Sequence, residues 1–201
     1  TDNTANGTVV ATTLMTGLTT VGLSASGDDG DTVFSGMKNF VDAEMSNGSG
    51  DLMLTYDGAQ AVSGTADVQN LAVSNMTAGT FTADGIETIN LTSSTTKSTL
   101  AAVTTGAGAA AELTSLKVSG DADLKITASV DFKAGTADGD TTIDATLDAS
   151  TFTGKLTVDL ADANDIQATG GTGADTFAFG ATLSKYDIID GGDGIDTVSI
   201  T

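Results

Sequence analysis

The sequence contains no histidine, cysteine, proline, tryptophan or arginine, and aromatic residues make up only 4% of its 201 residues. Without histidine or cysteine, the chain cannot form a Ser-His-Asp or Cys-His catalytic group, a thiolate or imidazole zinc site, or a disulfide. Aromatic side chains usually line a sugar-binding cleft, but this chain has no tryptophan and only two tyrosines, Tyr56 and Tyr186. We therefore do not expect an enzyme, although carboxylates for glycoside hydrolysis are plentiful.

Positive charge is scarce. Seven lysines stand against 27 acidic residues, all but three of them aspartates, which gives a formal net charge of −20. Nucleic-acid binding is not expected, because phosphate contacts need clustered lysine and arginine. The chemistry left open is that of carboxylate, hydroxyl and carbonyl oxygens, which above all means binding of a hard cation such as Ca²⁺.

Long apolar runs are also missing, so we expect no membrane span. At 39% hydrophobic residues, the chain can nevertheless bury a real core and is unlike a disordered acidic tail. No signal peptide follows Thr1, and we expect the chain to be a piece of a longer protein. The acidic composition without cysteine or arginine is typical of an extracellular bacterial protein.

Short alternating runs dominate what is present. In each of them, apolar side chains occupy one face and polar side chains the other, as in a half-buried strand. Examples are Leu116-Lys117-Val118, Leu124-Lys125-Ile126, Leu156-Thr157-Val158-Asp159-Leu160, Phe177-Ala178-Phe179 and Val198-Ser199-Ile200. Turns rich in glycine, aspartate, asparagine and serine separate the runs. This pattern predicts an all-β protein.

Short sequence motifs also recur along the chain at uneven intervals. Asp29-Gly30-Asp31-Thr32 returns as Asp138-Gly139-Asp140-Thr141. Loose repetition of short strands favours a β-solenoid, in which each coil buries its face on the next. A β-sandwich is the alternative for the first hundred residues, where the alternation is weaker.

The sequence patterns of two segments fit more than one secondary structure. Met37, Phe40, Val41 and Met45 follow helical spacing, with Ser35 as a cap and Asn47-Gly48 as an end, so a short helix packed on the sheet is one interpretation. The alanine-rich stretch 101–111 fits either a loop or a weak helix.

The strongest motif is near the C-terminus. Two nonapeptides match the pattern G-G-x-G-x-D-x-U-x throughout, where U is an apolar residue. They are Gly170-Gly171-Thr172-Gly173-Ala174-Asp175-Thr176-Phe177-Ala178 and Gly191-Gly192-Asp193-Gly194-Ile195-Asp196-Thr197-Val198-Ser199. The glycines permit tight backbone curvature that turns carbonyl oxygens inward, and the aspartate adds a charged oxygen. Two such turns, stacked, would offer about six oxygens to Ca²⁺.

Further aspartates extend the candidate set. Asp187 lies nine positions before Asp196, and Asp165 lies ten before Asp175. A partial match near the N-terminus adds Asp28, Asp29 and Asp31. The candidate metal ligands are therefore Gly170, Thr172, Gly173, Asp175, Asp187, Gly191, Asp193, Gly194 and Asp196, followed by Asp165, Asp28, Asp29 and Asp31.

At these nonapeptides the sequence resembles the RTX (repeats-in-toxin) family of secreted bacterial proteins. The resemblance implies a right-handed parallel β-roll or β-solenoid that Ca²⁺ orders outside the cell. It covers residues 164–201, and we divide the chain into a Thr/Ala/Asp-rich β region (1–160) and an RTX-like segment (161–201) of one continuous module. The remaining sequence, for example Gly85-Ile86-Glu87-Thr88-Ile89-Asn90-Leu91, looks like crystalline surface-layer proteins and large adhesins.

These resemblances imply a structural, self-associating module on the bacterial cell surface, with tandem neighbours or surface polysaccharide as partners. The strand pattern Thr197–Thr201 is then expected to pair with a following repeat or a neighbouring subunit. The alternative is the calcium-binding secretion module of a larger toxin or exoenzyme; a third reading, a carbohydrate- or ice-binding face, would need a regular threonine row. The plainer interpretation of the motif is ordinary β-turns that use glycine and aspartate for their geometry.

Overall fold

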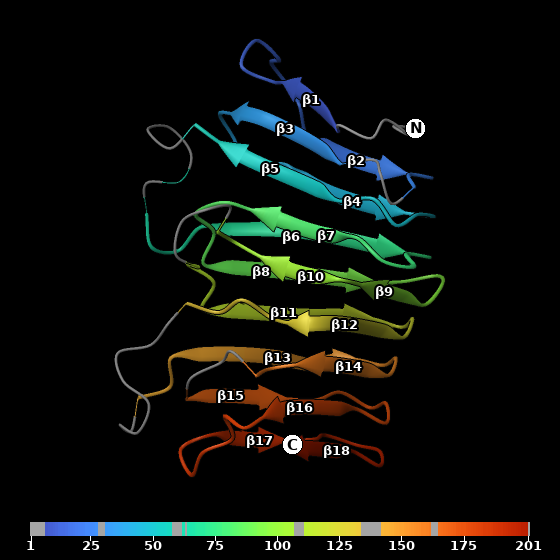
Figure 1. Cartoon of the computed structure of the whole chain (residues 1–201), viewed down its shortest axis with the longest axis vertical. Coiled ribbons are helices and arrows are strands. Elements are labelled where there is room, and N and C mark those ends of the chain that lie inside the picture. Colours follow the sequence, from blue (N-terminus) through green and yellow to red (C-terminus); the bar gives the residue numbers. More distant parts are fainter. Residues whose placement is uncertain are drawn as a thin grey trace.

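The computed structural model describes residues 7–27, 31–57, 62, 64–106, 111–133, 142–161 and 165–200. These residues form strands and connecting turns and contain no helix. Every strand pairing is parallel. The fold is a parallel β-solenoid, as the sequence predicted (Figure 1).

One long sheet runs through the whole solenoid. Its eight strands are β2 (Thr20–Ser24), β4 (Asp42–Ser46), β6 (Val68–Ser74), β8 (Thr88–Ser93), β11 (Ser115–Gly120), β13 (Ala145–Phe152), β15 (Ile166–Thr169) and β17 (Ile188–Asp190).

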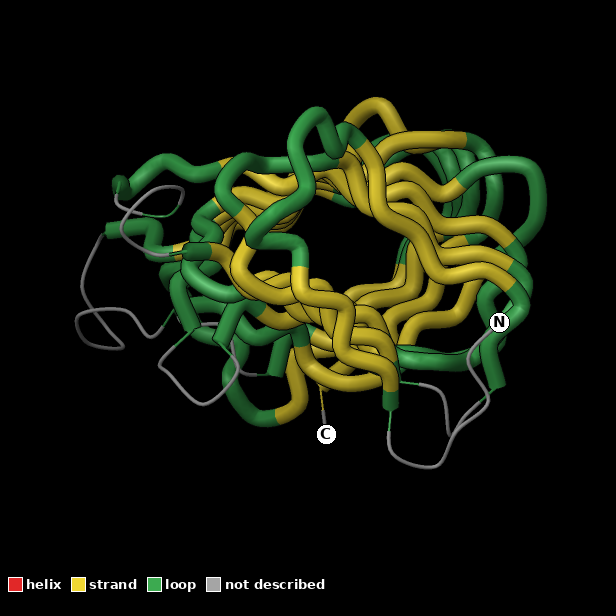
Figure 2. Tube along the Cα trace, turned by 90° about the horizontal axis from the view of Figure 1, so that it is seen from above, coloured by secondary structure: helices red, strands yellow, loops and turns green. Residues whose placement is uncertain are grey.

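Two five-stranded sheets complete the coils. The N-terminal one contains β1 (Thr8–Ala11), β3 (Thr32–Met37), β5 (Leu52–Tyr56), β7 (Thr80–Ala83) and β10 (Ala102–Thr104). The C-terminal one contains β9 (Ser98–Leu100), β12 (Leu124–Ser129), β14 (Leu156–Asp159), β16 (Thr176–Gly180) and β18 (Thr197–Ile200). Only Ala101 separates β9 from β10, so a single coil passes from one of these sheets to the other. Seen from above, the stacked coils form a flattened ring (Figure 2).

The coils differ in length, which explains why the sequence repeats are loose. In the eight-stranded sheet, the shortest step joins Val68 to Thr88, 20 residues on, and the longest joins Ser119 to Thr151, 32 residues on. Most of the extra residues lie in the turns, and the register within a strand pair shifts only at local irregularities, as between Lys117 and Ser119 of β11. The ladders also cross residue 160 without a break, because β13 pairs with β15 and β14 with β16.

The core is a column of aliphatic and phenylalanine side chains inside the coils. Leu71 and Leu91 face each other on β6 and β8, and both are at most 1% exposed. The phenylalanines Phe152 and Phe177 are fully buried further along the column. Burial of each such side chain contributes roughly 1.5–3 kcal/mol, so stacked inward-facing positions supply the main stabilisation.

The segment around Met37 to Met45 forms strands, so the short helix predicted there is wrong. Met37 ends β3, and Val41, Ala43 and Met45 are buried at every second position through the turn and β4. This period of two is that of a strand, whereas Ala43 would face away from Val41 on a helix. Gly36, at φ +71°, also breaks a helical path.

Two other expectations are resolved by the same topology. A β-sandwich in the first hundred residues is wrong, because a sandwich is built from antiparallel strands and this region contains only parallel pairs. Within 101–111, residues 102–104 form β10, and 107–110 lie outside the described residues. No helix able to cross a membrane occurs in the described part of the chain.

Candidate cation-binding edges

The flattened coils have two edges on which the candidate ligands fall. The chain leaves the eight-stranded sheet through turns 170–175 and 191–196, which we call the glycine edge (at the right of Figure 1). It returns to the same sheet at the residues just before β15 and β17, which we call the acidic edge. Asp175 and Asp196 therefore lie on one edge, and Asp165 and Asp187 on the other.

The two nonapeptide turns of the glycine edge stack directly. The amide of Gly170 donates to the carbonyl of Asp190 at 2.7 Å, and the amide of Asp193 donates to the carbonyl of Gly171 at 2.9 Å. Thr176 and Thr197 then pair as β16 and β18 begin. The turns are consequently held one coil apart, with their motif positions in register.

Glycine is required where these turns touch. Gly192 has φ +81°, and a Cβ there would lie 2.2 Å from the carbonyl oxygen of Gly171 and 2.9 Å from that of Gly170. Gly194 has φ +121°, and its Cβ position lies 2.2 Å from the carbonyl oxygen of Gly173. The space that side chains would fill is thus lined by backbone oxygens.

The aspartates of the glycine edge bind backbone amides. Asp175 is fully buried, and its Oδ1 accepts from the amide of Leu156 while its Oδ2 accepts from the amide of Gly171, both at 2.8 Å. Asp196 repeats the contact with the preceding coil, since its Oδ1 accepts from the amide of Asp175 at 2.9 Å, whereas the amide of Gly192 donates to Oδ1 of Asp190. Each carboxylate therefore links its own turn to the preceding coil. The side chains of Thr172 and Asp193 are exposed.

The acidic edge has a different arrangement. Asp187 accepts from the amide of Ile166 at 3.0 Å and from the amide of Ser184 at 2.6 Å. Asp165 is only 1% exposed, and its Oδ1 accepts from the hydroxyl of Ser184 at 3.2 Å. Its Oδ2 is buried and has no hydrogen-bond partner among the described residues.

Asp31, the N-terminal candidate that the structure describes, lies far from both pairs. Asp31 directly precedes β3, near the opposite end of the solenoid, and its backbone carbonyl accepts from the amide of Thr8. Asp28 and Asp29 lie outside the described residues, as do Asp138 and Asp140.

Sequence reasoning missed Ser184 and a second acidic pair on the acidic edge. Asp67 directly precedes β6 and Glu87 directly precedes β8. The amide of Asp67 donates to Oε2 of Glu87 at 2.8 Å. A signal was present, because an acidic residue stands immediately before an alternating run at both of these positions as well as at Asp165 and Asp187.

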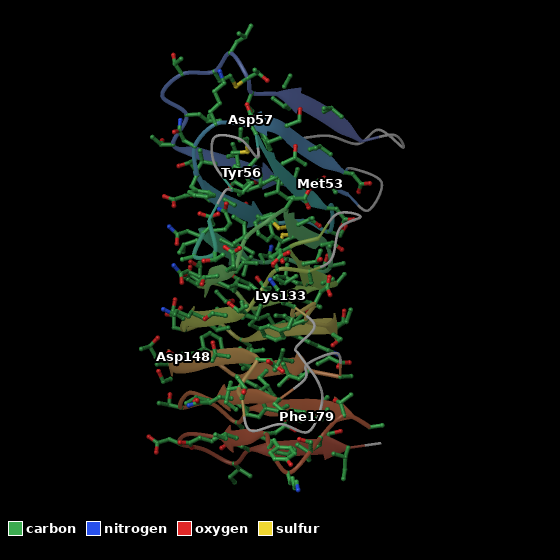
Figure 3. The ribbon with its side chains drawn as sticks, turned by 90° about the vertical axis from the view of Figure 1, so that its left-hand side faces the viewer. Met53, Tyr56, Asp57, Lys133, Asp148 and Phe179 are labelled. Carbon is green, nitrogen blue, oxygen red and sulfur yellow. The ribbon has the colours of Figure 1, made fainter. Side chains whose placement is uncertain are left out.

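Charge compensation by lysine is slight. In the described part of the chain the one ion pair joins Lys133 to Glu112, and that hydrogen bond raises the pKa of the lysine. Asp148, at the outer surface (Figure 3), has a lowered pKa because the hydroxyl and amide of Ser150 donate to it. Within the described residues no three carboxylates gather into a metal site, so any cation bound there would need carbonyl, hydroxyl or water oxygens.

Comparisons with protein-family models, with curated proteins and with solved structures find no match to this chain.

Proposed function

We propose that this chain is a structural, non-enzymatic module of an extracellular bacterial surface layer or adhesin, and that Ca²⁺ orders it. The observation that carries the proposal is the register of the glycine edge, where two complete Gly–Asp nonapeptide turns stack one coil apart. The choice of Ca²⁺ as the ion and of an extracellular location follows from the similarity of these nonapeptides to RTX repeats.

The oxygens of the glycine edge suit a hard cation. The carbonyl oxygens of Gly170, Gly171 and Gly173 face the following turn across positions where no side chain fits. The carboxylate of Asp196 lies beside them, with its Oδ1 3.5 Å from the Cβ position of Gly194. Ca²⁺ takes six to eight oxygen ligands, which such carbonyls, carboxylates and water can supply.

The net charge gives the cation an energetic role. A charge of −20 opposes the compact state, and the solenoid brings aspartates of successive coils together at its edges. An ion that binds the folded form alone stabilises it by about 2.7 kcal/mol per site at a hundredfold excess over its dissociation constant. Extracellular calcium would then favour the folded coil, and low cytosolic calcium would favour a flexible chain during export.

Calcium is expected to raise the melting temperature by about 5–10 °C at a hundredfold excess, because a chain of this size shifts by about 2–4 °C per kcal/mol. The measurement is thermal unfolding followed by far-UV circular dichroism, in calcium and in EGTA. The double variant Asp175→Asn/Asp196→Asn should lose most of this gain. Glu44→Gln, which removes one exposed charge on β4, should retain it. A wild-type melting temperature that ignores calcium would contradict the proposal.

Self-association is the second part of the proposed role. Val198 and Ile200 on β18 are 46% and 65% exposed, and Ile188 on β17 is 52% exposed. A further coil stacked on this face, from a following repeat or a second copy, would bury Val198 and Ile200 and satisfy the strand edge, whereas Ile188 pairs with the exposed Gln167 on the outer surface.

We expect wild-type protein to form oligomers in millimolar calcium, measured by size-exclusion chromatography with light scattering. Ile200→Asp should shift the population toward monomer, since it places a charge on the apolar face. Thr151→Asp adds the same charge to the exposed outer side of β13 and should leave the oligomers intact. Wild-type protein that stays monomeric in calcium would remove the support for assembly.

A further inference from the structure

Asp165 is a deeply buried carboxylate of the acidic edge with little charge compensation. It is 1% exposed, accepts one neutral hydroxyl donor and leaves Oδ2 buried without a partner among the described residues. Gln69, by contrast, is a buried polar side chain of this fold whose amide group is hydrogen-bonded at both its nitrogen and its oxygen. It is also fully buried, and its Nε2 donates to the carbonyl of Val41 at 2.7 Å while its Oε1 accepts from the hydroxyl of Tyr56.

An ionised carboxylate in this position is costly. Burying a charge costs several kcal/mol unless it is paired and hydrogen-bonded, and a single hydroxyl donor is a weak substitute. Lysine does not compensate it in the described residues, where the one ion pair is remote. Lys185, which follows Ser184 in the sequence, places its Nζ 4.7 Å from the ring centroid of Tyr186 instead.

The surroundings of Asp165 bring further oxygens and fix their positions. Asp187 precedes the next strand of the same sheet, one coil on, and is held by the amides of Ile166 and Ser184. The hydroxyl of Ser184 in turn accepts from the amide of Tyr186 at 3.1 Å. Ser184 therefore ties the turn before β17 to the carboxylate before β15.

We propose that Asp165 is the anchor of a second site for a hard divalent cation, on the acidic edge, with Ser184 and Asp187 beside it. The proposal rests on the proposed function for the ion, Ca²⁺, but places a site where neither turn carries the glycine motif. The cation takes the free Oδ2 of Asp165 and completes its shell with neighbouring oxygens and water. It thereby fastens the turn 181–187 onto the preceding coil.

The two edges can be distinguished by terbium luminescence. Tb³⁺ replaces Ca²⁺ at oxygen sites, and its emission under tyrosine excitation requires a tyrosine close to the ion. Tyr186 lies on the acidic edge, adjacent to Asp187, whereas the glycine edge is on the other side of the coil; the second tyrosine, Tyr56, lies on β5 in the N-terminal half. We expect wild-type protein to show tyrosine-sensitised emission that Ca²⁺ displaces.

Asp165→Asn and Tyr186→Phe should each abolish this emission, and Ser184→Ala should weaken the apparent Tb³⁺ affinity several-fold. Glu44→Gln should leave it unchanged. Absent emission in the wild type, or undiminished emission in Asp165→Asn, overturns the second site. Absent emission together with calcium-dependent stabilisation overturns this site alone, whereas sensitised emission without such stabilisation supports the site and contradicts the proposed function. If Asp165→Asn does not fold, Tyr186→Phe and Ser184→Ala still decide, because unchanged emission in both overturns the site.

Discussion

Gly192→Ala is expected to lower the free energy of unfolding by about 3 kcal/mol or more, even in the absence of calcium. An alanine with positive φ costs about 1–2 kcal/mol in a conformation that glycine adopts freely. The added Cβ would also lie 2.2 Å from the carbonyl oxygen of Gly171, a backbone atom of the preceding turn that can move only if the coils separate. The strain therefore falls on the stacking of the two turns.

Gly17→Ala is the matched control. Gly17 has φ +79°, nearly the same as the +81° of Gly192, but nothing lies within 4 Å of its Cβ position. The Gly17→Ala substitution should lower the free energy of unfolding only by the conformational cost of an alanine at positive φ, about 1–2 kcal/mol. The measurement is urea unfolding followed by far-UV circular dichroism, with the midpoint and the slope compared among wild type and both variants. Equal losses for the two alanine variants would show that the close contact between the turns does not exist in solution.

The fold could be predicted from the sequence because alternation is a local signal. Runs such as 116–118 and 124–126 became β11 and β12, with the apolar residues inside the coils. The prediction of a helix at 37–45 was wrong because apolar residues four positions apart fit both the strand period of two and the helical period of 3.6. Ala43 was the residue that distinguished the two, and its small side chain made the alternation easy to overlook.

The candidate site could be predicted only in part. The two glycine turns were recognisable by motif, and in each of them the motif aspartate accepts a backbone amide of the preceding coil. The division of the aspartates between two edges was not foreseen, although its cause is simple: the coils here step 21 residues, as between Ala168 and Ile189, so nine residues span about half a coil. Asp187 therefore lies across the solenoid from Asp196. The burial of Asp165 depends on how the turn 181–187 folds over it, which no local pattern encodes.

Asp175→Ala is expected to lower the free energy of unfolding by about 2–6 kcal/mol in EGTA, because this aspartate has a structural role that is separate from the proposed calcium binding. The side chain is fully buried and is the acceptor for the amides of Leu156 and Gly171. Alanine leaves both donors without their acceptor, and each buried unsatisfied group costs about 1–3 kcal/mol. The decrease in the free energy of unfolding should already be present in the calcium-free protein. In calcium the decrease should be larger, because the variant lacks the carboxylate proposed as a ligand.

Asp123→Ala provides the comparison. Asp123 also accepts a backbone amide on the same side of the coil, that of Lys155 at 2.9 Å, but this bond is exposed. Water can replace the acceptor there, so the expected loss is below about 1 kcal/mol. Chemical unfolding of both variants in EGTA and in millimolar calcium separates the two roles of Asp175. If Asp175→Ala is no less stable than Asp123→Ala in EGTA but loses the calcium gain, the carboxylate acts as a ligand alone and the two buried hydrogen bonds contribute nothing.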